Sequence, residues 1–173
     1  AFKEKIRLYK YYYPRSMYRD ILNLNILQNL QLQKLINENL KEENKYFSYD
    51  YFFKNCSTIP RNHINTVLNN RVYEIFSQIT TKQTFRYYIR NHLDRPGAMA
   101  FLLDILMNER IDYKISAWEE MFYPLKLREH LLKMHTVDNS GQINHKQKLI
   151  NKSETILSFP SPPKETSTFP NYF

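Results

Sequence analysis

The chain has 173 residues, a length that suits one folded unit with one hydrophobic core. A hydrophobic fraction of 42% excludes a disordered chain, and only two glycines favour a helix-rich body over a tightly turned all-β fold. The net charge of +8 fits an anionic partner, but the basic residues are dispersed, as compositional bias also produces.

The single cysteine excludes an internal disulfide. No apolar stretch approaches the roughly 18 residues that cross a bilayer. The chain starts at Ala1, inside charged amphipathic sequence, with neither an initiator methionine nor a signal peptide. We therefore expect it to be a fragment of a longer protein.

Residues 2–11 predict a short amphipathic helix that Pro14 ends. Residues 18–24 alternate imperfectly between apolar and polar and predict a strand. Asn25 with Gln28 forms a capping box for the next helix. The leucines expected to share one face of that helix are Leu27, Leu30, Leu35 and Leu40.

Residues 46–53 form an aromatic run, which we expect to be buried and either extended or a tight turn. A helix is predicted over residues 56–70, with an irregular start or a bend at Pro60. Thr81 is expected to cap a helix that runs through His92, with Phe85, Tyr88 and Ile89 facing inward.

Residues 98–109 predict the most apolar helix of the core. Ser116 with Glu119 forms a second capping box, and Pro124 suits the first position of a helix over residues 125–134. Residues 143–158 could supply two short strands. We predict a helical cysteine-containing domain, a β-prone tail and a Pro-rich linker, over residues 1–135, 136–158 and 159–173.

Cys56 is the strongest candidate for chemistry. If Asn55 caps the following helix, the backbone N–H groups of Ser57 and Thr58 lie in its first turn. Those donors and the positive end of the helix dipole favour a thiolate, and they could also hold the oxyanion of a tetrahedral intermediate. The alternative is a plain buried cysteine, because free cysteine is among the most buried residue types.

A thiol nucleophile needs a base, and no histidine is well placed in the sequence. His63 lies two turns further along the predicted helix, about 10 Å from Cys56. The other histidines have no orienting carboxylate beside them and are expected at the surface: His92, His130, His135 and His145. Neither a metal site nor a cofactor motif is evident.

Several segments together resemble the Lnb N-terminal periplasmic domain family. The Tyr/Phe-rich run that ends in Asn-Cys-Ser-Thr resembles the family's aromatic segment before its Asn-Cys motif. The ordered segments that carry the resemblance are Leu22-Asn23-Leu24, Tyr49-Asp50-Tyr51-Phe52-Phe53-Lys54-Asn55-Cys56-Ser57-Thr58, Thr84-Phe85-Arg86, Phe101-Leu102-Leu103-Asp104 and Glu120-Met121-Phe122-Tyr123-Pro124. They span about residues 1–165.

The resemblance implies a predominantly α, α+β fold: the helical, cysteine-bearing half of a circularly permuted papain-like domain with a short β-prone C-terminal segment. It implies a periplasmic thiol acyltransferase, tethered to the inner membrane in the full-length protein. Cys56 would take an acyl chain from a phospholipid and pass it to a lipoprotein N-terminus. Asn55 would orient the loop, Ser57 and Thr58 would serve the oxyanion, and the pocket would comprise Tyr49, Asp50, Tyr51, Phe52, Phe53 and Arg86.

The family's catalytic histidine precedes the cysteine in a β-rich half, often in a Gly-His pair, and this chain has no Gly-His. We therefore expect the catalytic base to be missing from it, either because the chain is an N-terminally truncated fragment, which its start at Ala1 favours, or because this copy of the domain is degenerate. Two alternatives stay open. One is a thiol hydrolase of the same fold (peptidase, amidase or esterase), and the other is a non-enzymatic basic helical module at a membrane surface or nucleic acid, without sequence-specific nucleic-acid recognition.

Overall fold

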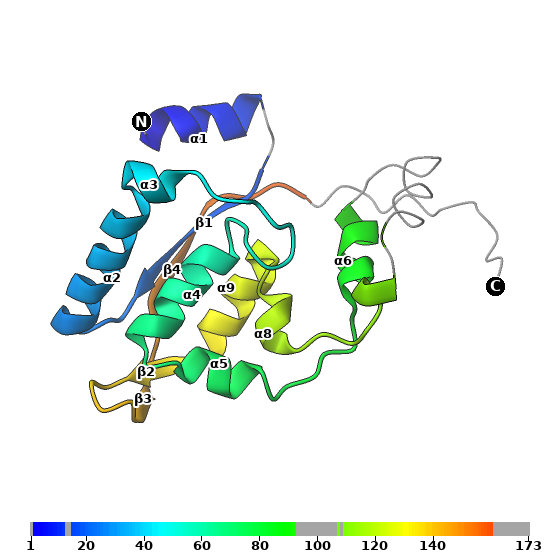
Figure 1. Cartoon of the computed structure of the whole chain (residues 1–173). Coiled ribbons are helices and arrows are strands. Elements are labelled where there is room, and N and C mark those ends of the chain that lie inside the picture. The colour runs from blue at the N-terminus through cyan, green and yellow to red at the C-terminus, as the bar shows by residue number, and fades with distance from the viewer. Residues whose placement is uncertain (1, 13–14, 93–106, 108, 161–173) are drawn as a thin grey trace, which may run out of the picture.

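The computed structural model describes residues 2–12, 15–92, 107 and 109–160. The core helix predicted over residues 98–109 and most of the Pro-rich segment lie outside these residues. In chain order the described elements are α1 (Phe2–Tyr11), β1 (Met17–Leu22), α2 (Ile26–Asn39), α3 (Glu42–Lys45), α4 (Thr58–Val67), α5 (Arg71–Phe76), α6 (Phe85–His92), the 3-10 turn η1 (Glu109–Ile111), α8 (Ala117–Glu120), α9 (Pro124–Lys133), β2 (His135–Val137), β3 (Ile143–Lys148) and β4 (Ile150–Leu157). The class is α+β with helices predominating, as predicted (Figure 1).

The start of α2 follows the predicted capping box. The Gln28 N–H donates to Asn25 Oδ1 over 3.0 Å, and the Asn25 N–H donates to Gln28 Oε1 over the same distance. The packed face of α2 differs from the predicted one. Gln28 is buried because its Nε2 donates to the Val137 carbonyl at 2.7 Å, and this bond turns Leu32 toward the core. Leu35 packs against the core, as predicted. Leu27, Leu30 and Leu40 are exposed.

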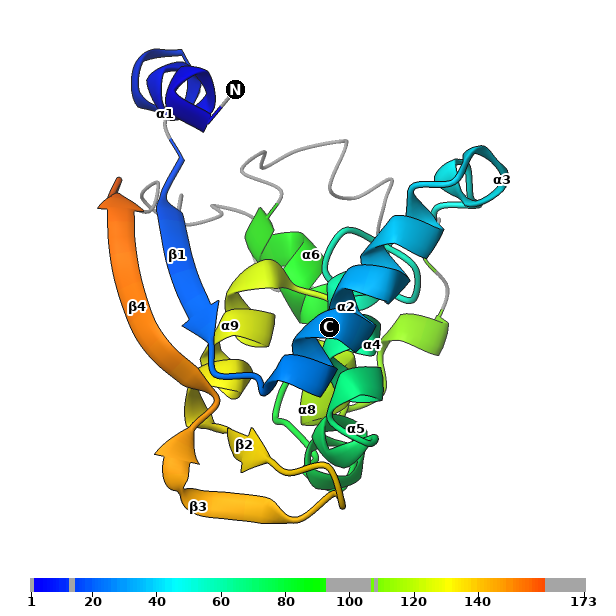
Figure 2. The ribbon, with the colours of Figure 1, turned by 90° about the vertical axis from the view of Figure 1, so that its left-hand side faces the viewer.

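Two antiparallel strand pairs lie beside the helical body. β1 pairs with β4, and β2 pairs with β3, so the two strands predicted within residues 143–158 are present. Figure 2 shows β1 and β4 as a curved ribbon beside the helices. The β-prone tail is therefore paired with the first strand of the chain. Leu149, just before β4, and Ile150, its first residue, are buried in the main core.

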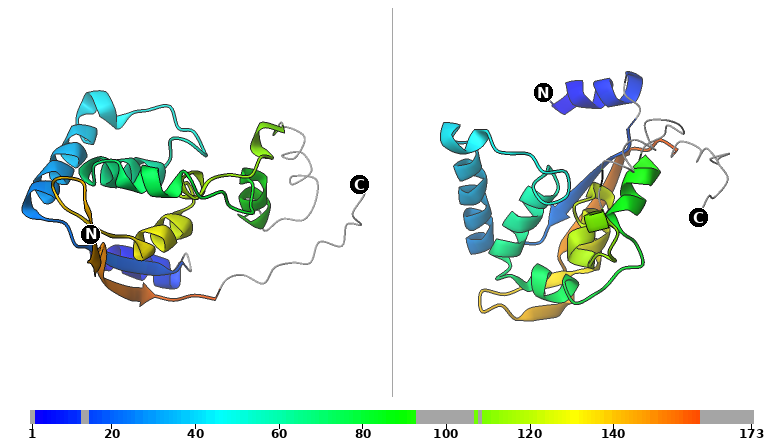
Figure 3. Two further views of the ribbon diagram at one scale, coloured as in Figure 1. Left: turned by 90° about the horizontal axis from the view of Figure 1, so that it is seen from below. Right: turned by 45° about the vertical axis from the view of Figure 1, so that its right-hand side comes forward.

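The main core lies where α4, α5, α8 and α9 meet the strands (Figure 3). Buried side chains recur about every three residues along α4, the pattern of an amphipathic helix. Thr58 and Arg61 occupy the first of these positions, and Ile64, Val67 and Leu68 supply the apolar contacts. The buried members of this core are Ile64, Val67, Leu68, Val72, Phe76, Ala117, Met121, Leu131, Met134, Val137, Leu149 and Ile150.

A second, aromatic cluster joins α6 to α8. Phe85, Tyr88 and Ile89 are buried on the inward face of α6, as predicted. The helix begins at Phe85, and not near Thr81, because the Thr81 hydroxyl donates to the Ile115 carbonyl instead. The buried residues of this aromatic cluster are Phe85, Tyr88, Ile115 and Phe122, with Phe52, Ile111 and Tyr123 packed against them.

The starts of α8 and α9 are also as predicted. The Glu119 N–H donates to Ser116 Oγ at 3.2 Å and the Ser116 N–H donates to Glu119 Oε2 at 2.8 Å, so this capping box is complete. Pro124 occupies the first position of α9, where its missing N–H costs no intrahelical bond. The tight corner between these helices holds Phe122 against the loop that precedes Cys56.

Candidate functional site

The loop before Cys56 is a closed turn built around Asp50. The N–H groups of Asp50 and Lys54 each donate to the other's carbonyl at 3.1 Å. Asp50 Oδ1 also accepts from the N–H groups of Phe52 and Phe53, at 2.9 and 2.8 Å. Asp50 therefore has a structural part in this turn, because its carboxylate satisfies two backbone donors that the turn leaves unpaired.

The aromatic run is mostly exposed, so the prediction of a buried run is wrong. Phe52 alone turns inward, and its ring centroid lies 4.5 Å from that of Phe85 and 5.4 Å from that of Phe122. Tyr49 and Phe53 are exposed by 61% and 58%. The turn at Asp50 is the reason, because a closed turn directs neighbouring side chains in divergent directions. Phe52 packs into the aromatic cluster, whereas the exposed rings of Phe53 and Tyr51 only flank it, 5.6 Å from Phe85 and 6.1 Å from Phe122.

Asn55 connects this loop to α4 and to the α8–α9 corner. Its side chain is buried, with Oδ1 accepting from the N–H groups of Ser57 and Thr58 at 2.8 and 2.9 Å. Nδ2 donates to the carbonyls of Tyr51 and Phe122, at 2.7 and 3.1 Å. All four hydrogen-bonding positions of this side-chain amide are thus used. Asn55 fixes the loop from both sides.

Cys56 is exposed and precedes the helix. The first residue of α4 is Thr58, where the sequence had predicted Cys56, and Pro60 lies in the first turn. The predicted oxyanion donors are occupied in this conformation, because Ser57 and Thr58 both donate to Asn55. The Thr58 hydroxyl accepts from the Asn55 N–H at 2.7 Å, which closes a second capping contact. The Asn55 side chain therefore accepts from the same two N–H groups that were expected to stabilise an oxyanion.

No hydrogen bond joins the Cys56 sulfur to an imidazole within the part of the chain that the structure describes. His63 Nε2 lies 2.6 Å from Asn39 Nδ2, across to α2, and burial lowers the pKa of His63. The rings of His135 and His145 face each other on the β2–β3 pair, 5.4 Å apart. The side chain of His92 lies outside the described residues.

His130 is buried, and the prediction that it lies at the surface is wrong. Its Nε2 is 2.7 Å from Glu120 Oε2, and the Tyr88 hydroxyl donates to Glu120 Oε1. Burial alone would raise the pKa of Glu120, but the hydrogen bonds from His130 and Tyr88 outweigh it and the pKa is lowered. No local pattern indicates this pair, because Glu120 and His130 are ten residues apart and meet only when α9 folds back on α8.

Basic side chains near the site have other partners. Arg61 is largely buried, stacks on the Trp118 ring at 3.8 Å and donates to the Trp118 carbonyl at 3.0 Å. Burial lowers the pKa of Arg61 to about 10. Arg86, a predicted pocket residue, is bound to Asp112 at 2.5 Å, on the side of α6 that joins η1. Both cations therefore have structural contacts away from the sulfur.

The phenols beside the loop stay neutral at physiological pH. Burial, with a smaller contribution from Tyr49, raises the pKa of Tyr51. Burial also raises the pKa of Tyr123. Together with Phe52 and Phe53 they give the loop an aromatic surface, and the exposed charged side chains of Asp50 and Lys54 lie at its edges.

The described residues contain no group of three or more His, Cys, Asp or Glu side chains that could hold a metal ion. None of their helices combines the length and apolarity needed to cross a bilayer.

The Lnb N-terminal periplasmic domain family matches residues 1–91. The match includes the Cys56 loop together with Leu22-Asn23-Leu24 and Thr84-Phe85-Arg86, whereas the resembling segments after residue 100 lie beyond it. No curated protein and no solved structure shows significant similarity to the chain. Because the match covers more than half of the 173 residues, the chain belongs to the Lnb N-terminal periplasmic domain family.

Proposed function

We propose that this periplasmic domain is an acyltransferase in which Cys56 is the nucleophile. The observation that carries the proposal is an exposed thiol on a loop that a saturated buried amide holds in place. A reactive cysteine must be reachable and fixed in position, whereas a structural free cysteine is usually buried and inert. Cys56 meets both conditions for a reactive one.

The proposed donor is a phospholipid. Cys56 Sγ attacks the carbonyl carbon of an ester-linked acyl chain and forms a C–S bond. The C–O bond between the acyl carbonyl carbon and the glycerol oxygen breaks, and the lysophospholipid leaves with the thiol proton on that oxygen. The acyl chain remains on the enzyme as a thioester. The exposed rings of Tyr49, Tyr51 and Phe53 support a hydrocarbon substrate, because they offer apolar surface beside the thiol.

The proposed acceptor is an amine such as the N-terminal cysteine of a lipoprotein. The amine nitrogen attacks the thioester carbonyl, a C–N bond forms, and the C–S bond breaks to restore the thiol. The backbone N–H groups of Ser57 and Thr58 already donate to Asn55 Oδ1, so we assign oxyanion stabilisation to the N–H of Cys56 itself. Hydrolysis shares the first step and differs only in using water as the acceptor.

We further propose that the helical body corresponds to the cysteine-bearing half of a permuted papain-like domain. The support is the placement of Cys56 immediately before a helix that packs, in one core, against antiparallel strands. In such enzymes the base comes from a separate β-rich segment. The described histidines, which are engaged with Asn39, Glu120 and each other, are consistent with that arrangement.

The test supplies both substrates. The protein is mixed with phospholipid vesicles and a diacylated lipopeptide that has a free amino terminus, and products are identified by mass spectrometry. Because the described histidines make no hydrogen bond to Cys56, we expect both products to form slowly, about 10²–10⁴-fold below the rate of a thiol enzyme with a positioned base. The N-acylated lipopeptide and the lysophospholipid should still appear in equal amounts, and neither should form with Cys56→Ala. Free fatty acid without acylated peptide would favour hydrolysis, and equal product from Cys56→Ala would refute the role of the thiol.

A further inference from the structure

The first helix of the chain has a cationic ridge. Lys3, Arg7 and Lys10 are spaced four and three residues apart, so they lie along one side of α1, and all three are exposed. The helix carries four basic residues against one acidic residue, Glu4. This local excess of positive charge contrasts with the dispersed charge of the rest of the chain.

Exposed apolar side chains lie next to the ridge. Leu8 is 41% exposed, and Tyr11 and Tyr12 are exposed by 66% and 70%. Lys10 Nζ lies 5.3 Å from the centre of the Tyr11 ring, so charge and aromatic surface are contiguous. A short helix with Lys and Arg on one side and Leu and aromatic residues on another is typical of segments that lie in the interface of a bilayer.

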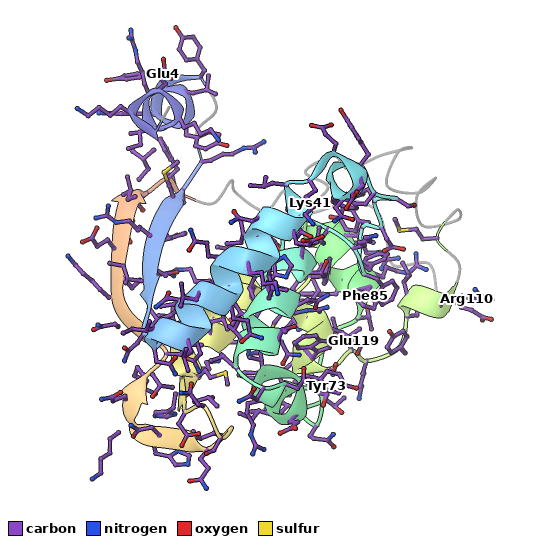
Figure 4. All side chains as sticks on the ribbon, turned by 60° about the vertical axis from the view of Figure 1, so that its left-hand side comes forward. Glu4, Lys41, Tyr73, Phe85, Arg110 and Glu119 are labelled. Carbon is purple, nitrogen blue, oxygen red and sulfur yellow. The ribbon has the colours of Figure 1, made fainter. Side chains whose placement is uncertain are left out.

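The position of α1 also fits a planar partner. Figures 1 and 2 show α1 standing off the body, at the end of the molecule that also carries α3. In Figure 4 the labelled side chain of Glu4 is well separated from Lys41, Phe85 and Tyr73 of the helical body. The exposed aromatic loop that leads to Cys56 follows α3 directly, so α1 and this loop approach the same side of the molecule.

We infer that α1 docks the domain on an anionic phospholipid surface. The cations match lipid phosphates, and the exposed Leu8, Tyr11 and Tyr12 match the boundary between headgroups and acyl chains. A nucleic acid would match the charge but not the exposed Leu8, and the family is periplasmic. The inference goes beyond the proposed function and does not depend on it, because docking requires no chemistry at Cys56.

The experiment measures co-sedimentation of the full chain with vesicles. Vesicles of phosphatidylcholine with phosphatidylglycerol are compared with vesicles of phosphatidylcholine alone, with Cys56→Ala protein so that acylation cannot contribute. The test variant is Lys3→Gln with Arg7→Gln and Lys10→Gln. The matched control is Lys82→Gln with Lys114→Gln and Lys146→Gln, three exposed lysines elsewhere that remove the same charge.

We expect binding to the anionic vesicles that weakens with salt, since exposed charges are screened. Each basic residue near an anionic surface is worth about a fivefold gain in partitioning, so the α1 variant should lose about 10²-fold while the control loses little. Equal losses in both variants would show attraction by net charge and overturn the inference. The inference is also overturned if the protein with an unsubstituted α1 fails to bind the anionic vesicles, or if the α1 variant binds them as tightly as that protein does. Circular dichroism confirms that both variants fold.

Discussion

Replacing Asn55 by alanine tests how the Cys56 loop is held. The substitution removes two donors to the carbonyls of Tyr51 and Phe122 and two acceptor bonds from the N–H groups of Ser57 and Thr58. Loss of a helix-capping side chain costs about 1 kcal/mol, and a buried polar group without a partner costs about 1–3 kcal/mol. Because the loop can partly relax toward water, we expect the free energy of unfolding to fall by about 3 kcal/mol in total.

Urea denaturation followed by Trp118 fluorescence and by circular dichroism measures this loss. The matched control is Asn91→Ala, which removes one exposed bond from Asn91 Nδ2 to the Tyr87 carbonyl, 2.9 Å long. That substitution should change the free energy of unfolding by no more than about 0.5 kcal/mol. If Asn55→Ala costs no more than Asn91→Ala, the buried amide does not fix the loop and the reasoning fails.

Further predictions concern the buried acid, the tail and the thiol. Glu120→Gln should cost about 1–3 kcal/mol at neutral pH. Because the pKa of Glu120 is lowered in the folded state, its carboxylate stabilises the fold fully above the ordinary pKa of 4.5, and this stabilisation is lost as the pH falls through the folded-state pKa. The loss of unfolding free energy in Glu120→Gln should therefore shrink on acidification in a series of denaturation curves. A loss that stays constant with pH would contradict the assignment. Leu149→Ala should destabilise the protein by about 2–5 kcal/mol, because Leu149 is fully buried. Leu27→Ala, at an exposed position, should leave thermal unfolding nearly unchanged. Equal effects of the two substitutions would show that the tail is not part of the core. Cys56 should react with iodoacetamide in the folded protein, and protection that only denaturant removes would show it is not accessible.

Local rules predicted the starts of α2, α8 and α9. The capping boxes of Asn25 with Gln28 and of Ser116 with Glu119 depend on residues three apart, and Pro124 acts through its own ring. The α+β class and the strands near the C-terminus also follow from local pattern. These features need no information about distant parts of the chain.

Features set by distant contacts could not be predicted. Burial of Gln28 requires the Val137 carbonyl, 109 residues away, and that bond turns the packed face of α2 away from Leu27, Leu30 and Leu40 while Leu35 stays on it. His130 is buried because a turn brings it to Glu120. Most of the aromatic run is exposed because Asp50 closes a turn that directs Phe52 into the core and leaves its neighbours largely in solvent. In each case a specific partner overrode the average behaviour of the residue type.

The most direct test of the account is the mass of the protein after incubation with phospholipid vesicles and no acceptor. The account predicts a mass increase of one fatty acyl group, located on Cys56 by peptide mapping and removed by neutral hydroxylamine, as a thioester is. Cys56→Ala should show no increase. An unmodified thiol after incubation under conditions that support transfer to lipopeptide, or an acyl group that persists in Cys56→Ala, would contradict the assignment of Cys56 as the acyl-accepting nucleophile.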